Sequence, residues 1–401
     1  MKNKIILTFL SAVLLSVTAS GCSGSGDSLP EDTPYNHCEK FSIMETEQGF
    51  YTNINGFASN GINLKFTEKG TNKQVYLCAK PECMHDGGEM CTATYKNLYS
   101  MNSVLYDGAV YTLVIENINE AVSYGIYRSA LDGSAITRVG SAFSVNNVKE
   151  ENYGFQIESF IIHKGYAYVP YHLSFGGSAG FAGGGLARMN LADGNSEIIY
   201  STESYYASTP QNLQSSGDFV YYDIYDTSSR NKGFYAYSIT DGTTEKLDLD
   251  KERVFIAGER VFVTKSTVWG KISSGAGNPH DIYAVNKETG VKTVLMNVDK
   301  GQIHCDSPLP YKDMIIITLD SGVYVYSETG ELISAVEALS TEAYGGSCTT
   351  LIFGDKLYLV EPNYEDNEAS FFPVSYSYYS CPVEDILGGR GEWRSEYVYY
   401  V

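Results

Sequence analysis

The sequence is poor in positive charge. It has 28 Lys and Arg residues against 48 Asp and Glu residues, which gives a formal net charge of −20 at pH 7. Binding to nucleic acid or to anionic lipid headgroups requires basic patches, so this balance argues against both kinds of partner. No phosphate-binding loop, dinucleotide fingerprint, His-Glu-x-x-His motif or calcium-binding loop occurs in the chain. The sequence therefore predicts a protein that binds no nucleic acid.

Long apolar segments and interdomain linkers are also scarce. The one extended apolar run, Ile5–Val17, is too short for a membrane-spanning helix. After it, no Pro-rich or highly charged stretch divides the chain, although 401 residues would allow two or three domains. The abundant residues are tyrosine, with 34, and glycine, with 39. Because these occur in many short apolar alternations, we expect one large all-β body.

The N-terminus has the pattern of a secretory signal. Lys2 and Lys4 precede the apolar run, and small residues ending in Cys22 follow it. A cysteine directly after Ala-Ser-Gly resembles the bacterial lipobox, in which the cysteine is lipidated and becomes the new N-terminus. We expect residues 1–21 to be a lipoprotein signal peptide, and the acyl chains on Cys22 to anchor the protein at the extracytoplasmic face of the cell membrane. The alternative is an ordinary signal cut near Gly21.

The segment that follows Cys22 is too polar to bury a core. Residues 22–38 are rich in Ser, Gly, Asp, Glu and Pro, so we expect a flexible tether between the lipid and the folded domain. Residues 39–401 then form that domain. Loss of the two lysines of the signal peptide takes the formal charge from −20 to −22.

The rest of the chain contains a recurrent unit. Its first half is an apolar strand, a turn with Gly or Asp, and a second apolar strand, as in Val104–Tyr111. Its second half is a strand that alternates with Tyr, a polar Gly turn and another strand, as in Ile126–Gly133. Asp-Gly and Thr-Gly turns supply the positive φ that tight hairpins need. The first-half turns recur at residues 49, 108, 165, 217, 258, 313 and 354.

Seven such units predict a β-propeller. A four-stranded sheet has two faces and cannot bury both alone, so the units must stack, and closing the stack into a ring protects its ends. The turns are spaced 41 to 59 residues apart, and the shorter spacings match the usual ~40–45 residues of a blade. We predict an all-β propeller of seven four-stranded blades. A six-bladed ring and a β-solenoid are the alternatives.

One segment concentrates reactive side chains. It begins at Cys78, ends at Cys91, and is expected after the last strand of the first blade. The pattern Leu-Cys-x-Lys-Pro-x-Cys-x-His…Cys-x-Ala is matched by Leu77, Cys78, Lys80, Pro81, Cys83, His85, Cys91 and Ala93. In this the chain resembles a family of Gram-positive bacterial surface lipoproteins, whose propellers are similar to the TolB and YWTD types. The resemblance implies the fold and the surface location, and it implies no activity.

The segment could be crosslinked in two ways, by a metal ion or by a disulfide. Three thiols, Cys78, Cys83 and Cys91, together with His85, could form a closed tetrahedral zinc site, although their spacing differs from the usual paired cysteines. A disulfide is the competing interpretation, because the expected location is oxidising, and Cys38 could pair with the third thiol. Free thiols are a third possibility. A catalytic Cys83–His85 pair is not expected, since no orienting carboxylate or oxyanion device is evident.

A second group of residues is a candidate for the central channel. Cys305 and Cys348 lie seven or eight residues before the turns of the sixth and seventh units, which places them near the start of the innermost strands. A Cys305–Cys348 disulfide would join two blades. His304, Cys305, Asp306 and Cys348 are together a possible polar cluster of the channel. Cys381, on a different strand, is expected to be unpaired or bound to another partner.

The pattern supports two functional hypotheses. The first is a non-catalytic ligand-binding or scaffold protein of the cell envelope, whose ligand is a glycan, a peptide or an envelope protein. Loop aromatics that could stack on such ligands are Tyr205, Tyr206, Trp269, Tyr344 and Trp393. The alternative is a propeller hydrolase or lyase that acts on extracellular polysaccharide or peptide through paired carboxylates or a metal in the funnel. No residue is predicted to be catalytic.

Overall fold

The computed structural model of the protein describes a large part of the chain beyond residue 43. Every described residue belongs to the unit Asp32–Val401. The predicted signal peptide, Cys22 and tether therefore lie outside the described residues. These are 44–54, 62–71, 73–85, 91–95, 99–118, 121–140, 153–156, 160–175, 181–202, 210–226, 231–247, 262–263, 267–273, 280–298, 308–319, 322–327, 329–337, 339, 349–363 and 375–400.

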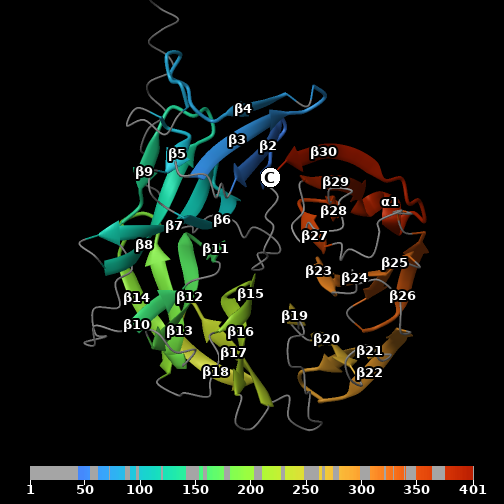
Figure 1. The fold of residues 1–401 in the computed structure, drawn as a ribbon. Coiled ribbons are helices and arrows are strands. Elements are labelled where there is room, and N and C mark those ends of the chain that lie inside the picture. The colour runs from blue at the N-terminus through green and yellow to red at the C-terminus, as the bar shows by residue number, and fades with distance from the viewer. Residues whose placement is uncertain are drawn as a thin grey trace, which may run out of the picture. The chain divides into compact units, whose positions relative to one another are not determined.

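Within these ranges the strands form seven antiparallel sheets, and each sheet uses strands that are consecutive in the chain (Figure 1). We number the sheets as blades 1 to 7. Blade 1 contains β1 (Met44–Glu45), β2 (Gly49–Ile54), β3 (Ile62–Glu68), β4 (Gln74–Tyr76) and β5 (Thr94–Tyr95). Blade 2 contains β6 (Tyr99–Tyr106), β7 (Ala109–Ile118), β8 (Ala121–Ala130) and β9 (Ile136–Arg138). Blade 3 contains β10 (Tyr153–Gln156), β11 (Ile161–His163), β12 (Tyr166–Phe175), β13 (Phe181–Asn190) and β14 (Ser196–Thr202).

The remaining sheets follow the same plan. Their members are β15 (Gln211–Ser216), β16 (Phe219–Asp226), β17 (Asn231–Ser238) and β18 (Thr243–Leu247) in blade 4; β19 (Phe262–Val263), β20 (Thr267–Ser273), β21 (His280–Asn286) and β22 (Lys292–Val298) in blade 5; β23 (Leu309–Tyr311), β24 (Met314–Leu319), β25 (Gly322–Ser327) and β26 (Leu332–Val336) in blade 6; β27 (Thr349–Phe353), β28 (Lys356–Asn363), β29 (Ser375–Pro382) and β30 (Arg394–Tyr400) in blade 7. A five-residue helix, α1 (Val383–Leu387), joins the last two strands.

Glycine turns set the hairpins as the sequence predicts. The turn between the third and fourth strands of a blade carries a glycine with φ between 66° and 88° in six blades: Gly70, Gly133, Gly194, Gly242, Gly290 and Gly330. Only glycine adopts this left-handed conformation without strain from a β-carbon. Of the first-half turns, Gly108, Gly165, Gly217 and Gly354 also have positive φ, whereas the turn at residue 258 lies outside the described residues.

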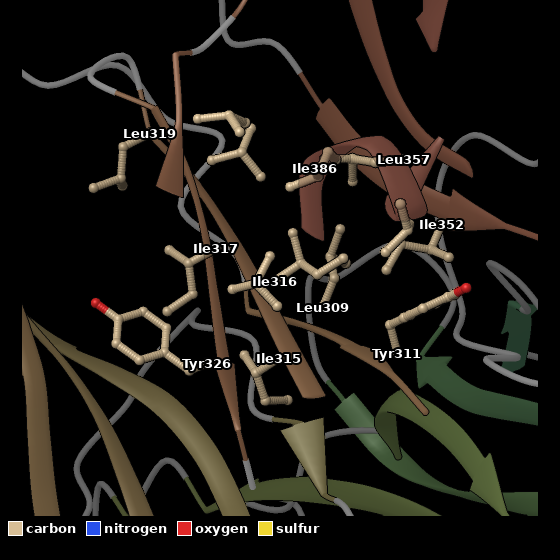
Figure 2. Packing of buried hydrophobic residues seen from close by; sticks show 14 of the residues in the cluster. Leu309, Tyr311, Ile315, Ile316, Ile317, Leu319, Tyr326, Ile352, Leu357 and Ile386 are labelled. Atoms are coloured by element: carbon tan, nitrogen blue, oxygen red, sulfur yellow. The ribbon is translucent and has the colours of Figure 1, made fainter. Parts of the chain in front are cut away.

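Buried hydrophobic clusters join the blades into a closed ring. We call the interface between two neighbouring blades a seam. At the 1/2 seam, Tyr51, Leu64 and Leu77 pack against Val110, and separate clusters span the 2/3, 3/4 and 4/5 seams. One large cluster runs through blades 5, 6 and 7; Figure 2 shows its residues from β23, β24, β25, β27, β28 and α1. Because neighbours cover each blade in turn, the all-β propeller prediction is confirmed.

The ring closes at the 7/1 seam without exchange of a strand among the described residues. Phe50 of blade 1 packs into a cluster of blade 7 that includes Leu351 and Tyr358. Beside it, the Glu45 carboxylate accepts hydrogen bonds from Lys69 Nζ, from Lys356 Nζ at 2.9 Å and from Tyr358 Oη. Among the described residues, side-chain contacts therefore hold the first and last blades together.

Candidate metal centre

The cysteine segment interrupts the outer strand of blade 1 and does not follow it. β4 pairs with Lys65–Thr67 of β3, and β5 pairs with Ile62 and Asn63 of the same strand. The Leu77 amide donates to the Leu64 carbonyl at 2.9 Å, and the Leu64 amide donates to the Ala93 carbonyl at 2.8 Å. Residues 78–92, which we call the cysteine loop, thus leave the strand and return to it at adjacent points. Local sequence patterns missed this because the strand resumes for only two residues, Thr94 and Tyr95.

Four potential ligands converge in the cysteine loop. Their ligand atoms, from Cys78, Cys83, His85 and Cys91, all lie within 4.8 Å of one another. His85 Nδ1 is 3.8 Å from Cys91 Sγ. In a tetrahedral site with metal–sulfur bonds of about 2.3 Å, neighbouring ligand atoms are about 3.8 Å apart. The donor set and its spacing therefore fit a four-coordinate metal ion, which these residues could hold after a small contraction.

Surrounding residues orient the imidazole and one thiol. His85 has a left-handed backbone, with φ of 55°, which is uncommon for a residue with a β-carbon. Its ring stacks on Tyr76 of β4 at a centroid distance of 4.9 Å. The Lys65 ammonium lies over the same Tyr76 ring, 5.2 Å from its centroid. The Thr94 hydroxyl donates to Cys91 Sγ at 3.3 Å. Strand residues on both sides of the loop thus position its ligands.

The thiols of the cluster differ in acidity. Burial opposes ionisation of Cys78, but hydrogen bonds from Thr92 and from the backbone of Lys80 outweigh it and lower the pKa of this thiol to about 6. The backbone hydrogen bond at His85 lowers the pKa of Cys83, yet burial and the neighbouring thiols together raise it. Close thiols cannot all ionise at once without a compensating charge, because like charges repel at this range.

All four described cysteines are free thiols: Cys78, Cys83, Cys91 and Cys381. No disulfide therefore forms among the described cysteines, and their arrangement fits either of the other two predicted alternatives, a metal group or free thiols. Cys38, proposed as a partner for the third thiol, lies outside the described residues. Cys381 is fully buried in β29, where burial raises its pKa to about 11.

The second predicted cluster is not described. His304, Cys305, Asp306 and Cys348 lie outside the described residues, and with them the predicted Cys305–Cys348 disulfide. The prediction that Trp269 is an exposed, ligand-stacking aromatic is wrong, because it is fully buried in β20 within the core of blades 5 to 7. Period-two alternation on a short strand does not distinguish an exposed ring from one that packs between blades.

Comparisons with known proteins identify the fold. No protein-family model and no curated protein matches the chain. Among solved structures, a prolyl endopeptidase has a TM-score of 0.52 and 11% identity over 92% of this chain and 50% of its own. A puromycin hydrolase has a TM-score of 0.52 and 12% identity over 90% of this chain and 54% of its own. The chain thus spans about half the length of these two proteins, and at such identity the likeness shows the fold alone.

A third similar structure, of an oligogalacturonate lyase in complex with manganese, has a TM-score of 0.46 and 11% identity over 81% of this chain and 84% of its own. Across the residues that the structure describes, no helix has the length and apolar character needed to cross a membrane.

Proposed function

We propose that this protein is a lipid-anchored β-propeller on the extracytoplasmic face of the cell membrane, where it acts as a non-catalytic binding or scaffold protein. We further propose that Cys78, Cys83, His85 and Cys91 hold a structural zinc ion. The zinc proposal is carried by the four converging ligand atoms of the cysteine loop, and the anchor proposal by the lipobox pattern that ends in Cys22. Catalytic zinc keeps a position open for water or substrate, whereas four protein ligands close the site.

The choice of zinc follows from the donor atoms. Three thiolates and one imidazole suit a borderline-soft ion with tetrahedral preference, and carboxylate-binding ions such as Mg²⁺ and Ca²⁺ are disfavoured. His85 would bind through Nδ1, the atom that faces Cys91. When bound, the ion would crosslink the thiolates. Tyr76 orients the His85 ring, and Thr94 orients the Cys91 thiol.

The zinc site is tested by metal analysis of the whole protein, purified under reducing conditions. We expect one equivalent of zinc, loss of most of it in Cys83→Ser, and full retention in Met84→Ala. Met84 is the matched control because it lies between two ligands and its side chain is 83% exposed. Zinc below about a tenth of an equivalent in the wild type, or thiol mapping that finds a disulfide among Cys78, Cys83 and Cys91, would refute the site.

The anchor is tested by fractionation of bacteria that express the full chain. Wild-type protein should sediment with membranes and enter the detergent phase, and Cys22→Ser should not acquire lipid. Cys38→Ser is the matched control, since it removes another N-terminal cysteine and should leave the anchor intact. Equal partitioning of the Cys22→Ser and wild-type proteins would refute lipidation at Cys22.

The binding role is tested with the purified protein on glycan and peptide arrays. Saturable binding to one chemical class without turnover is the expected result. The solved hydrolase and lyase structures raise the other possibility, that the propeller acts on polysaccharide or peptide, and cleavage of a bound array ligand would replace the scaffold proposal. Absence of binding on both arrays would refute it.

A further inference from the structure

Neighbouring blades share a recurrent close contact. In it, a glycine from the connection between the third and fourth strands of one blade lies against the end of the fourth strand of the preceding blade. A β-carbon built on Gly194 of blade 3 would lie 2.3 Å from Gly140 Cα, which follows β9 of blade 2. At the 6/7 seam a β-carbon on Gly391 would lie 3.1 Å from the Glu337 carbonyl oxygen. These approaches are possible because glycine has no side chain.

At the 1/2 seam the same contact involves the cysteine loop. A β-carbon on Gly133 of blade 2 would lie 2.8 Å from the backbone nitrogen of Cys78, the first predicted zinc ligand. The Gly133 carbonyl oxygen accepts a hydrogen bond from the Ala79 amide at 3.0 Å and another from the Thr92 hydroxyl at 2.7 Å. The two ends of the cysteine loop therefore contact one carbonyl group of the neighbouring blade.

A metal ion would tie these two ends together. Cys78 adjoins Ala79, and Cys91 adjoins Thr92, so an ion bound to both thiolates joins the residues on either side of the Gly133 carbonyl. We propose that zinc fastens blade 1 to blade 2 by holding both ends of the cysteine loop on the β8–β9 turn. This inference rests on the zinc site proposed above, and it assigns that site to one seam of the ring and not to blade 1 alone.

The position in the ring gives this fastening a consequence. Blade 1 also forms the 7/1 seam, where the side chains of Glu45, Phe50 and their partners join it to blade 7. Removal of the ion therefore loosens the blade at which the ring closes, and the seams between blades 5, 6 and 7, which share one large core, stay packed. Zinc availability would then control how firmly the propeller is closed.

Hydrogen exchange of the whole protein, with zinc bound and after removal of zinc by a chelator under reducing conditions, tests the proposal. We expect exchange at least about tenfold faster in the stripped protein for peptides that contain the Leu77 and Ala79 amides and the β8–β9 turn. Peptides of β24 and β25 in blade 6 should exchange at the same rate in both states. This measurement requires no variant to fold.

A pair of variants tests the reciprocal effect. If zinc stabilises the 1/2 seam, opening that seam must weaken zinc binding by the same factor. Gly133→Ala should therefore weaken zinc binding about tenfold, measured by competition with a chromophoric chelator. Gly194→Ala makes the equivalent change at the 2/3 seam and should alter zinc affinity less than twofold.

The outcomes separate the two proposals. A wild-type protein without zinc refutes the zinc site, and the fastening with it. Stoichiometric zinc whose removal leaves exchange at the 1/2 seam unchanged refutes the fastening alone. Faster exchange spread evenly over all blades also refutes it, because the ion would then stabilise the whole domain and not this seam.

Discussion

Replacing Glu45 with glutamine tests how the ring closes. The Glu45 carboxylate belongs to blade 1, its side chain is 10% exposed, and it forms ion pairs with Lys69 of blade 1 and Lys356 of blade 7. Tyr358 of blade 7 donates a hydrogen bond to its other oxygen. Glutamine keeps the shape and one acceptor oxygen but removes the charge, so the change acts on the electrostatic part of the closure.

The expected loss of stability is about 2 kcal/mol. Removing one partner of a fully buried ion pair costs about 3–5 kcal/mol. Here each lysine keeps another partner, because Lys356 also contacts Glu396 at 3.2 Å and Lys69 also donates to the Thr46 carbonyl at 2.7 Å. Both lysine side chains are about a third exposed, at 31% and 32%, which reduces the loss further. In a domain of this size, about 2 kcal/mol corresponds to about 3 °C in Tm.

The effect has a defined pH dependence. Burial raises the pKa of Glu45, but hydrogen bonds from Lys69, Tyr358 and Lys356 outweigh it and hold the pKa below its usual value of 4.5. A carboxylate with a lowered pKa contributes stability that is present above its unfolded pKa and is lost as pH falls through its folded pKa. The difference in Tm between wild type and Glu45→Gln should therefore be full at pH 7 and shrink below about pH 4.5.

Differential scanning calorimetry from pH 7 to pH 3 measures this difference. Glu47→Gln is the matched control, because it removes the same charge from an exposed side chain two residues after Glu45. Surface substitutions of this kind usually have small effects, so Tm should change by less than about 1 °C. The reasoning fails if the two variants lose equal stability, or if the loss in Glu45→Gln is as large at pH 3 as at pH 7.

Two further predictions concern thiols and glycines. In the metal-free, reduced protein, iodoacetamide at pH 7.5 should modify Cys78, whose pKa is lowered to about 6, and spare Cys381, which is fully buried; early modification of Cys381 in peptide maps would contradict the packing. Gly194→Ala should destabilise the protein by at least about 2 kcal/mol more than Gly165→Ala in urea unfolding. Both positions have left-handed φ, but a β-carbon meets Gly140 at the first and no atom within 4 Å at the second, so equal losses would exclude a steric cause.

Much of the architecture could be predicted from local patterns. The Asp-Gly and Thr-Gly turns identify hairpins because positive φ is a property of the residues themselves, and the left-handed Gly133 and Gly290 confirm it. The grouping of Cys78, Cys83, His85 and Cys91 is also local, since a single short loop carries all four. Their spacing alone left a disulfide, a metal site and free thiols open, because it does not show how the loop turns.

Other features depend on contacts between distant residues. Glu45 and Lys356 are more than 300 positions apart, and neither has a neighbouring motif that indicates the pair. Trp269 reads as a loop aromatic until the core of blades 5 to 7 closes over it. The two-residue β5 pairs with Ile62 and Asn63, the part of the β3 edge that β4 leaves uncovered.

The sequence by itself determined the period of the repeat, the hairpin turns and the ligand residues of the cysteine loop, because each follows from side-chain chemistry within a few residues. The tertiary structure decided which blade meets which, where the ring closes, and that the cysteine loop lies on the Gly133 turn of the next blade. These depend on how whole sheets cover one another's faces, and the energy of that packing is shared among residues from every blade.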